Sequence, residues 1–172
     1  WHQCISDGLT PILAAYGLGK AQRLIAGLDT NIGPILTHGA IENTNQIMRD
    51  QKIAIPETFL ITSKLDLANF KNAIVLAPPS ALSTSWVKKF GKISTGYASG
   101  WMAIRGIKRR RAADKGFVIS DHADWNGLNL AIKATEAEKI FVTHGYTDSF
   151  SKWLQFKGLN ASVVKTEFTT TE

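Results

Sequence analysis

Short apolar runs alternate with segments of helical pattern along most of this chain. Apolar runs that stop at glycine, proline or a polar residue are typical of buried strands. The predicted strands are 11–16, 34–37, 73–77, 117–120 and 140–143. The helical patterns between them cover 21–28, 40–51, 124–135 and 147–157. This alternation predicts an α/β fold with a mainly parallel sheet and helices on both faces.

Five further segments have less regular patterns of apolar and polar residues, and each predicts a different element. They are an edge strand over 56–60, a short helix from Ser63 to about Asn69, a helix from the Pro78–Ser80 turn through Phe90, one bent strand or two over 95–105, and a final strand over 159–168. The chain shows no internal repeat and no low-complexity segment.

Two histidines follow predicted strands near the end of the chain. His122 lies between Asp121 and Asp124, and His144 ends the next strand. Carboxyl ends of parallel strands share one edge, so the pair could supply a proton donor and a metal ligand to one site. Asp121 or Asp124 would orient His122, and Asp124 is also a good N-cap for the helix predicted after it. The alternative is that both histidines only cap or hydrogen-bond. His38 has no such neighbours, and we expect a structural role for it.

Three segments are candidates for contacts with phosphate. Gly17–Lys20 joins a strand to a helix, where backbone N–H groups and the Lys20 ammonium would attract an anion. Ser80 begins another helical segment. Arg109, Arg110 and Arg111 form the centre of a basic run, and arginine suits phosphate in charge and geometry. The alternative for Gly17–Lys20 is an ordinary glycine turn with a surface lysine. The alternative for the basic run is a solvated hairpin tip.

Composition limits the class of protein. The 172 residues are 44% hydrophobic with a net charge of +6, which suits one domain or two small ones and favours an anionic partner. The sequence has no apolar run long enough for a membrane helix and no pattern of a signal peptide. The lone cysteine, Cys4, forms no internal disulfide. We therefore expect a cytoplasmic protein that does not enter a membrane.

Several segments, in order, resemble one family over nearly the whole chain. They are Ala15–Arg23, Gly33–Glu42, Ala77–Ala81 with Trp86 and Phe90–Gly91, Ala98–Met102, Arg109–Arg111, Phe117–Trp125 and Val142–Tyr146. The chain resembles the β-CASP branch of the metallo-β-lactamase-fold nucleases. Within that branch it is similar to the bacterial ligase-associated DNA exonucleases, also described as mRNA 3′-end-processing-factor-like exonucleases.

The resemblance implies roles for the two histidines. Ser120-Asp121-His122-Ala123-Asp124 matches the family's Ser-x-His-x-Asp stretch, whose histidine is held to be a general acid. His144 matches a strand-end His-Gly that supplies a zinc ligand in related members. The intact enzyme would use two zinc ions. Its partners would be DNA or RNA, together with proteins of a DNA ligase or helicase pathway.

The sequence departs from the family in lacking any His-x-His, and it also lacks the acidic Glu-Ser-Thr-like stretch. The resemblance therefore implies a piece of a longer enzyme, with most of a β-CASP domain in 1–113 and the last lactamase-like elements in 114–172. We expect this chain alone to bind zinc weakly and not to cleave nucleic acid, because two histidines and two aspartates are too few for a two-metal site.

Two other functions remain open at the level of sequence. One is a non-catalytic nucleic-acid-binding module, and the other is a small-nucleotide-binding α/β domain that uses Gly17–Lys20. The residues do not distinguish DNA from RNA, since both present the same phosphates. The family name favours DNA.

Overall fold

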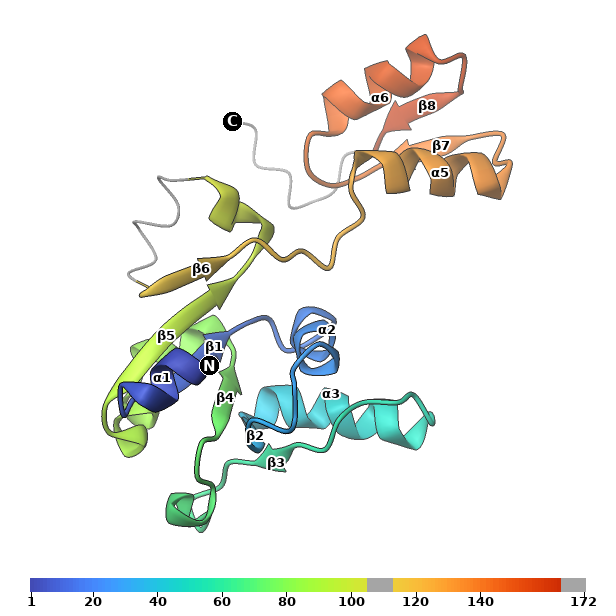
Figure 1. Cartoon of the computed structure of the whole chain (residues 1–172). Coiled ribbons are helices and arrows are strands. Elements are labelled where there is room, and N and C mark those ends of the chain that lie inside the picture. Colours follow the sequence, from blue (N-terminus) through green and yellow to red (C-terminus); the bar gives the residue numbers. More distant parts are fainter. Residues whose placement is uncertain (105–112, 165–172) are drawn as a thin grey trace. The chain divides into compact units, whose positions relative to one another are not determined.

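A computed structural model describes residues 1–104 and 113–164, and the chain divides into two compact units (Figure 1). The first unit is Trp1–Asp121 and the second is His122–Glu172. The division of the chain at residue 113 into a β-CASP part and a lactamase-like part stays a prediction. No helix in the described ranges is long and apolar enough to cross a membrane.

The first unit is built on one parallel sheet, and the predicted α/β class is confirmed. Within the described residues, every strand pair in it is parallel. The strands in spatial order are β3 (Phe59–Leu60), β2 (Ile35–Thr37), β4 (Ile74–Ala77), β1 (Thr10–Ala14), β5 (Ile93–Ala98) and β6 (Lys115–Phe117). Between or before these strands, the described residues of the unit form the α-helices α1 (His2–Ser6), α2 (Lys20–Ala26) and α3 (Gly39–Asp50).

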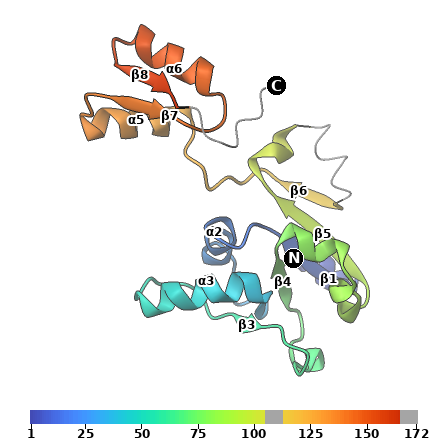
Figure 2. The same cartoon turned by 180° about the vertical axis from the view of Figure 1, so that it is seen from behind.

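Side chains of successive strand residues alternate between two apolar layers. Leu13, Ile35 and Leu76 pack with residues of α2 and α3 on one face. Ile12 and Val75 pack on the other face with residues of short 3₁₀ helices. Figures 1 and 2 show α2 and α3 side by side in both views. Both faces of the central strands are covered, which explains why those strands read as continuous apolar runs.

The prediction of one α-helix from Pro78 to Phe90 is wrong. The segment forms two 3₁₀ helices, η2 (Pro79–Ser83) and η3 (Ser85–Phe90). The hydroxyl of Ser83 donates to the carbonyl of Ser80, and the hydroxyl of Thr84 donates to the carbonyl of Ala81 at 2.8 Å. Thr84 also accepts from the backbone N–H of Trp86. Such local hydrogen bonds compete with those of an α-helix.

Three other predicted elements also differ from the structure. The segment predicted as a bent strand contains β5, which ends at Ala98, and then η4 (Gly100–Ala103), because the Ser99 hydroxyl caps a new turn by accepting from Trp101 N–H. The strand predicted over 117–120 is β6, which ends at Phe117 where Ile119 N–H turns back to the Phe117 carbonyl. The helix predicted from Ser63 is only η1 (Leu67–Asn69), capped by Asp66.

Up to residue 164, where its described part ends, the second unit contains two helices and a parallel strand pair. They are α5 (Trp125–Thr135), β7 (Ile140–Val142), α6 (Thr147–Phe156) and β8 (Ala161–Val163). Val142, Leu154 and Ala161 form its small buried core, with Trp153 packed against them. The final strand was predicted to reach residue 168, and 165–168 lie outside the described residues.

Candidate functional site

Polar residues follow the strands of the first unit at one edge of its parallel sheet. β1 and β4 are neighbours, yet β1 leads to α2 on one face and β4 leads to η2 on the other. Ligands of α/β proteins bind where adjacent strand ends diverge in this way. Gly17–Lys20 follows β1 and Ser80 follows β4, so the sheet brings these two predicted phosphate contacts to the same edge.

The glycine turn after β1 is held by a buried glutamine. Gln22 accepts from Gly19 N–H at 2.8 Å and donates to the Gly17 carbonyl at 2.9 Å. A Cβ on Gly17 would lie 2.8 Å from the Ala40 carbonyl oxygen, and Gly19 has φ +81°. Both positions therefore require glycine. The turn is a rigid part of the strand edge.

Lys20 is buried, and its side chain is only 5% exposed. Its ammonium lies 3.0 Å from a carboxylate oxygen of Asp121 and 5.1 Å from the centre of the Tyr16 ring. One turn further along α2, the Arg23 guanidinium donates to the carbonyl of Ser120. The structure thus pairs two predicted site residues that the sequence had assigned to different roles. Contact of Lys20 with a phosphate stays a prediction.

A buried polar network continues from Gln22 into α3. Gln22 donates to Asn45, and the carboxylate of Glu42 lies at the centre of the remaining contacts. Its hydrogen-bond donors are Thr37 at 2.6 Å, Thr58 at 2.6 Å, Arg49 at 2.7 Å and Asn45 at 3.1 Å. Burial raises the pKa of Glu42, but these hydrogen bonds outweigh burial and leave the pKa below its ordinary value. Glu42 is therefore ionised at neutral pH. Its hydrogen bonds connect α3 to Thr37 of β2 and to Thr58, which directly precedes β3.

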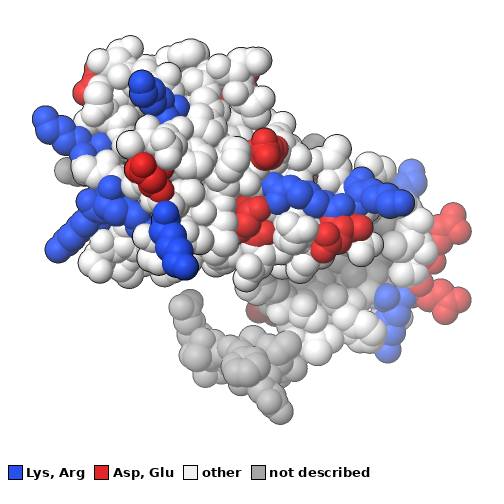
Figure 3. Space-filling view, turned by 90° about the horizontal axis from the view of Figure 1, so that it is seen from below, with Lys and Arg blue, Asp and Glu red and all other residues white. Residues whose placement is uncertain are grey.

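Ser80 is exposed at the start of η2, where it could meet a ligand. The predicted arginine contacts, Arg109 to Arg111, lie outside the described residues. The face seen in Figure 3 carries both acidic and basic side chains.

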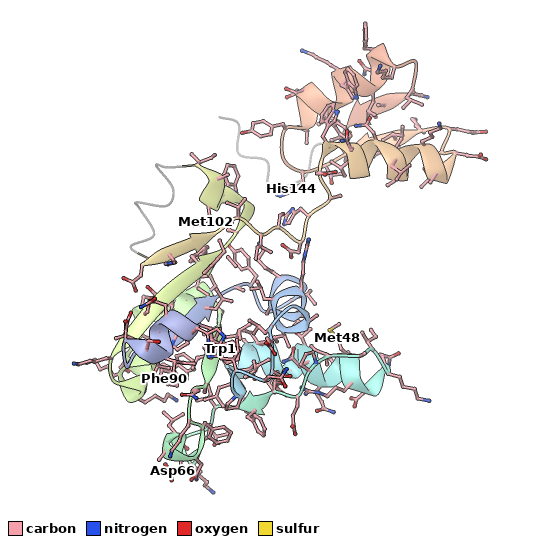
Figure 4. The ribbon with its side chains drawn as sticks, in the orientation of Figure 1. Trp1, Met48, Asp66, Phe90, Met102 and His144 are labelled. Carbon is pink, nitrogen blue, oxygen red and sulfur yellow. The ribbon has the colours of Figure 1, made fainter. Side chains whose placement is uncertain are left out.

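The second unit holds His122, Asp124 and His144. The carboxylate of Asp124 accepts from Gly127 N–H at 2.7 Å and caps α5, as its sequence position predicted. His144 is exposed on the loop between β7 and α6, where Figure 4 labels it. No group of three or more His, Cys, Asp or Glu residues that could hold a metal occurs in the described ranges. These residues do not make a zinc site by themselves.

His38 has a structural position, because it is the N-cap of α3. Its Nδ1 accepts from Ala40 N–H at 3.1 Å, and its ring lies edge-on to Trp86. Burial lowers the pKa of His38, and the nearby Lys89 ammonium lowers it further. The neutral imidazole is therefore favoured, as an accepting Nδ1 requires.

Sequence reasoning did not find the contacts made by Gln22, Arg23 and Glu42. A signal for the network was present on α3, where Glu42, Asn45 and Arg49 recur at intervals of three and four residues and so share one helix face. The partners from β2 and the β3 segment are distant in sequence, and no local pattern indicates them.

The fold and strand-end residues define a parallel α/β protein with a polar carboxyl edge. No family model matches the chain, and no solved structure matches it. The chain is 28% identical over 160 residues to a protein of Opitutus terrae named "Probable DNA ligase". The similarity covers 93% of this chain and 15% of the relative, so the chain spans less than a sixth of that protein's length.

Proposed function

We propose that this chain is part of a metal-dependent nuclease that hydrolyses phosphodiester bonds of DNA, in the setting of DNA repair. The observation that carries the proposal is the similarity of 93% of the chain to a protein named as a DNA ligase. The resemblance to ligase-associated exonucleases, drawn from the residues alone, agrees with that name. The polar strand edge of the first unit supports a site for an anionic ligand.

In this proposal His122 donates a proton to the leaving oxygen of the cleaved bond. Asp124 fixes the backbone just after His122, because its carboxylate caps α5. A proton donor acts efficiently only when its position is held, and a capped helix start provides such a hold. Asp121 lies directly before His122 and completes the predicted catalytic set.

His144 offers one imidazole to a zinc site, and the other ligands come from outside these 172 residues. The described residues supply no complete metal site. Zinc bound by the intact protein would supply an activated water.

Ser80, which lies at the strand edge, would bind nucleic acid together with Arg109, Arg110 and Arg111. Each lost phosphate contact reduces the slope of log affinity against log salt by about 0.7 to 0.9. Changing the three arginines to alanine is expected to flatten the slope accordingly. A matched control removes three exposed lysines instead, Lys71, Lys88 and Lys92. Equal slopes for the two variants would leave the arginine run without a role in binding.

The experiment that tests the function compares the intact protein with the 172-residue chain. Both are incubated with end-labelled DNA and RNA strands, with zinc and with chelator. The intact protein should cleave DNA in a chelator-sensitive reaction, and the 172-residue chain should bind without cleaving. Cleavage by neither protein would favour a non-catalytic binding module. Binding of mononucleotides but not of strands would favour a small-nucleotide domain.

A further inference from the structure

We propose that Lys20 and Arg23, here called the α2 anchor, position the segment that leads into His122, and that Lys20 is not a phosphate ligand. This inference rests on the proposed function of His122. The anchor residues lie three apart on α2, so both side chains project from the same helix face. Lys20 pairs with Asp121 at 3.0 Å, and Arg23 donates to the carbonyl of Ser120. The anchored residues thus precede His122 directly in the chain.

Packing also brings the segment before His122 close to α2. A Cβ on Gly19 would lie 3.1 Å from the carboxylate of Asp121, and one on Gly100 would lie 3.4 Å from the Ser120 Cβ. Ile119 packs against the core cluster that contains residues of α2. The glycine at position 19 therefore allows the segment to approach the start of α2 closely, and the anchor contacts fix it there.

The burial of Lys20 decides between the two roles. Its side chain is 5% exposed and that of Asp121 is 23% exposed, so the ammonium has lost most of its water in exchange for one carboxylate. A phosphate bound to this ammonium would either bring a second negative charge beside the Asp121 carboxylate or have to displace that carboxylate. The geometry therefore favours an internal partner for Lys20.

The start of α2 is rigid enough to act as an anchor. Gln22 ties it to the Gly17 carbonyl at 2.9 Å and to Asn45 at 2.9 Å, and Asn45 is fully buried. Because the first turn of α2 is fixed to β1 and α3, the contacts of Lys20 and Arg23 fix the segment relative to the sheet. The sequence Ser120-Asp121-His122 therefore leaves the first unit from a defined point.

A double-mutant cycle on the 172-residue chain tests the anchor without any enzymatic assay. The variants are Lys20→Met, Asp121→Asn and the two combined, with Lys71→Met as the control for loss of an exposed lysine. The measurement is amide hydrogen exchange at Ile119 to Asp121. Each single variant should speed exchange about tenfold, and the combined variant should be no faster than either, because contacting residues are coupled. Additive effects, or no effect, would overturn the proposal.

Arg23→Met gives a second route if Lys20→Met fails to fold, because Arg23 is exposed. It should speed exchange in the same segment by losing the bond to the Ser120 carbonyl. Unchanged exchange in this variant would count against the anchor.

Kinetics of the intact protein separate positioning from phosphate binding. Lys20→Met should lower kcat about tenfold while KM and its salt dependence stay within twofold. A raised KM with a flatter salt slope would show a phosphate contact and overturn the proposal. If the intact protein cleaves nothing, the proposed function fails, and the exchange measurement still decides whether the anchor exists.

Discussion

Glu42→Gln is the most informative test of the polar network that holds the strand edge. In the structure, one carboxylate oxygen of Glu42 accepts from Thr37, Thr58 and Asn45, and the other accepts from Arg49. A glutamine can keep an oxygen at only one of these places. The cheaper choice keeps the oxygen toward the three neutral donors and turns the NH₂ group toward the Arg49 guanidinium.

The cost follows from the contacts that this choice loses. The ion pair with Arg49 at 2.7 Å is replaced by two opposed donors, and three charge-assisted hydrogen bonds become neutral ones. The Glu42 side chain is 14% exposed, so water compensates only in part. A hydrogen bond to a charged group contributes about 1.5–3 kcal/mol, and we expect the variant to lose about 2–3 kcal/mol of unfolding free energy. For a protein of this size that corresponds to a Tm lower by about 6–8 °C.

Thermal unfolding followed by circular dichroism measures the effect, with the exposed Glu57→Gln as control. The difference also depends on pH. Because the folded pKa of Glu42 is lowered, its stabilisation is present at neutral pH and is lost as the pH falls below about 4.3 toward the folded pKa. The gap between wild type and variant should narrow over that range. A Tm equal to that of Glu57→Gln, or a gap that does not change with pH, would refute the reasoning.

Three further predictions follow from single residues. His38→Asn keeps the α3 cap and removes the titrating ring. Because the folded pKa of His38 is lowered, this residue should cost the wild type stability as the pH falls below about 6.5, and the variant should lack that loss. Parallel curves of unfolding free energy against pH would contradict this. Gly19→Ala should lower the free energy of unfolding by about 2 kcal/mol, which is more than the loss in Gly158→Ala. Gly158 has the same φ of +81°, but an added Cβ there would meet nothing within 4 Å, and equal losses of Tm in the two variants would contradict the prediction. Leu154→Ala should cost the second unit about 2–5 kcal/mol in urea unfolding followed by tryptophan fluorescence, since Leu154 is fully buried, and an unchanged midpoint would exclude a packed core there.

The sheet could be predicted from the sequence because its central strands are buried on both faces. Runs such as Ile74–Ala77 have no polar interruption, and that pattern is specific for a covered parallel strand. The elements from Pro79 to Phe90 could not be predicted, because the choice between α and 3₁₀ turns depends on which carbonyls the serine and threonine hydroxyls bind. The end of β6 was missed for a similar reason, since its register depends on pairing with β5 rather than on its own residues.

The candidate site was predictable in its residue types and less so in its contacts. The cap made by Asp124 follows from a local pattern and is confirmed. Lys20 and Asp121 form an ion pair although they lie about a hundred positions apart in the sequence. The residues next to each of them are typical of a side chain exposed to solvent. Burial of a lysine depends on the whole fold, so the sequence alone left a phosphate contact and a surface lysine as the two interpretations of Lys20. The roles of His122 and His144 stay predictions.

The most direct test of the account measures metal content and single-turnover cleavage for His122→Ala and His144→Ala in the intact protein. His144→Ala should lower zinc occupancy, because it removes a ligand. His122→Ala should keep its zinc and lose about 10² to 10⁴ in the rate of cleavage, the usual contribution of a positioned proton donor. Loss of zinc from His122→Ala together with full zinc in His144→Ala would contradict the account.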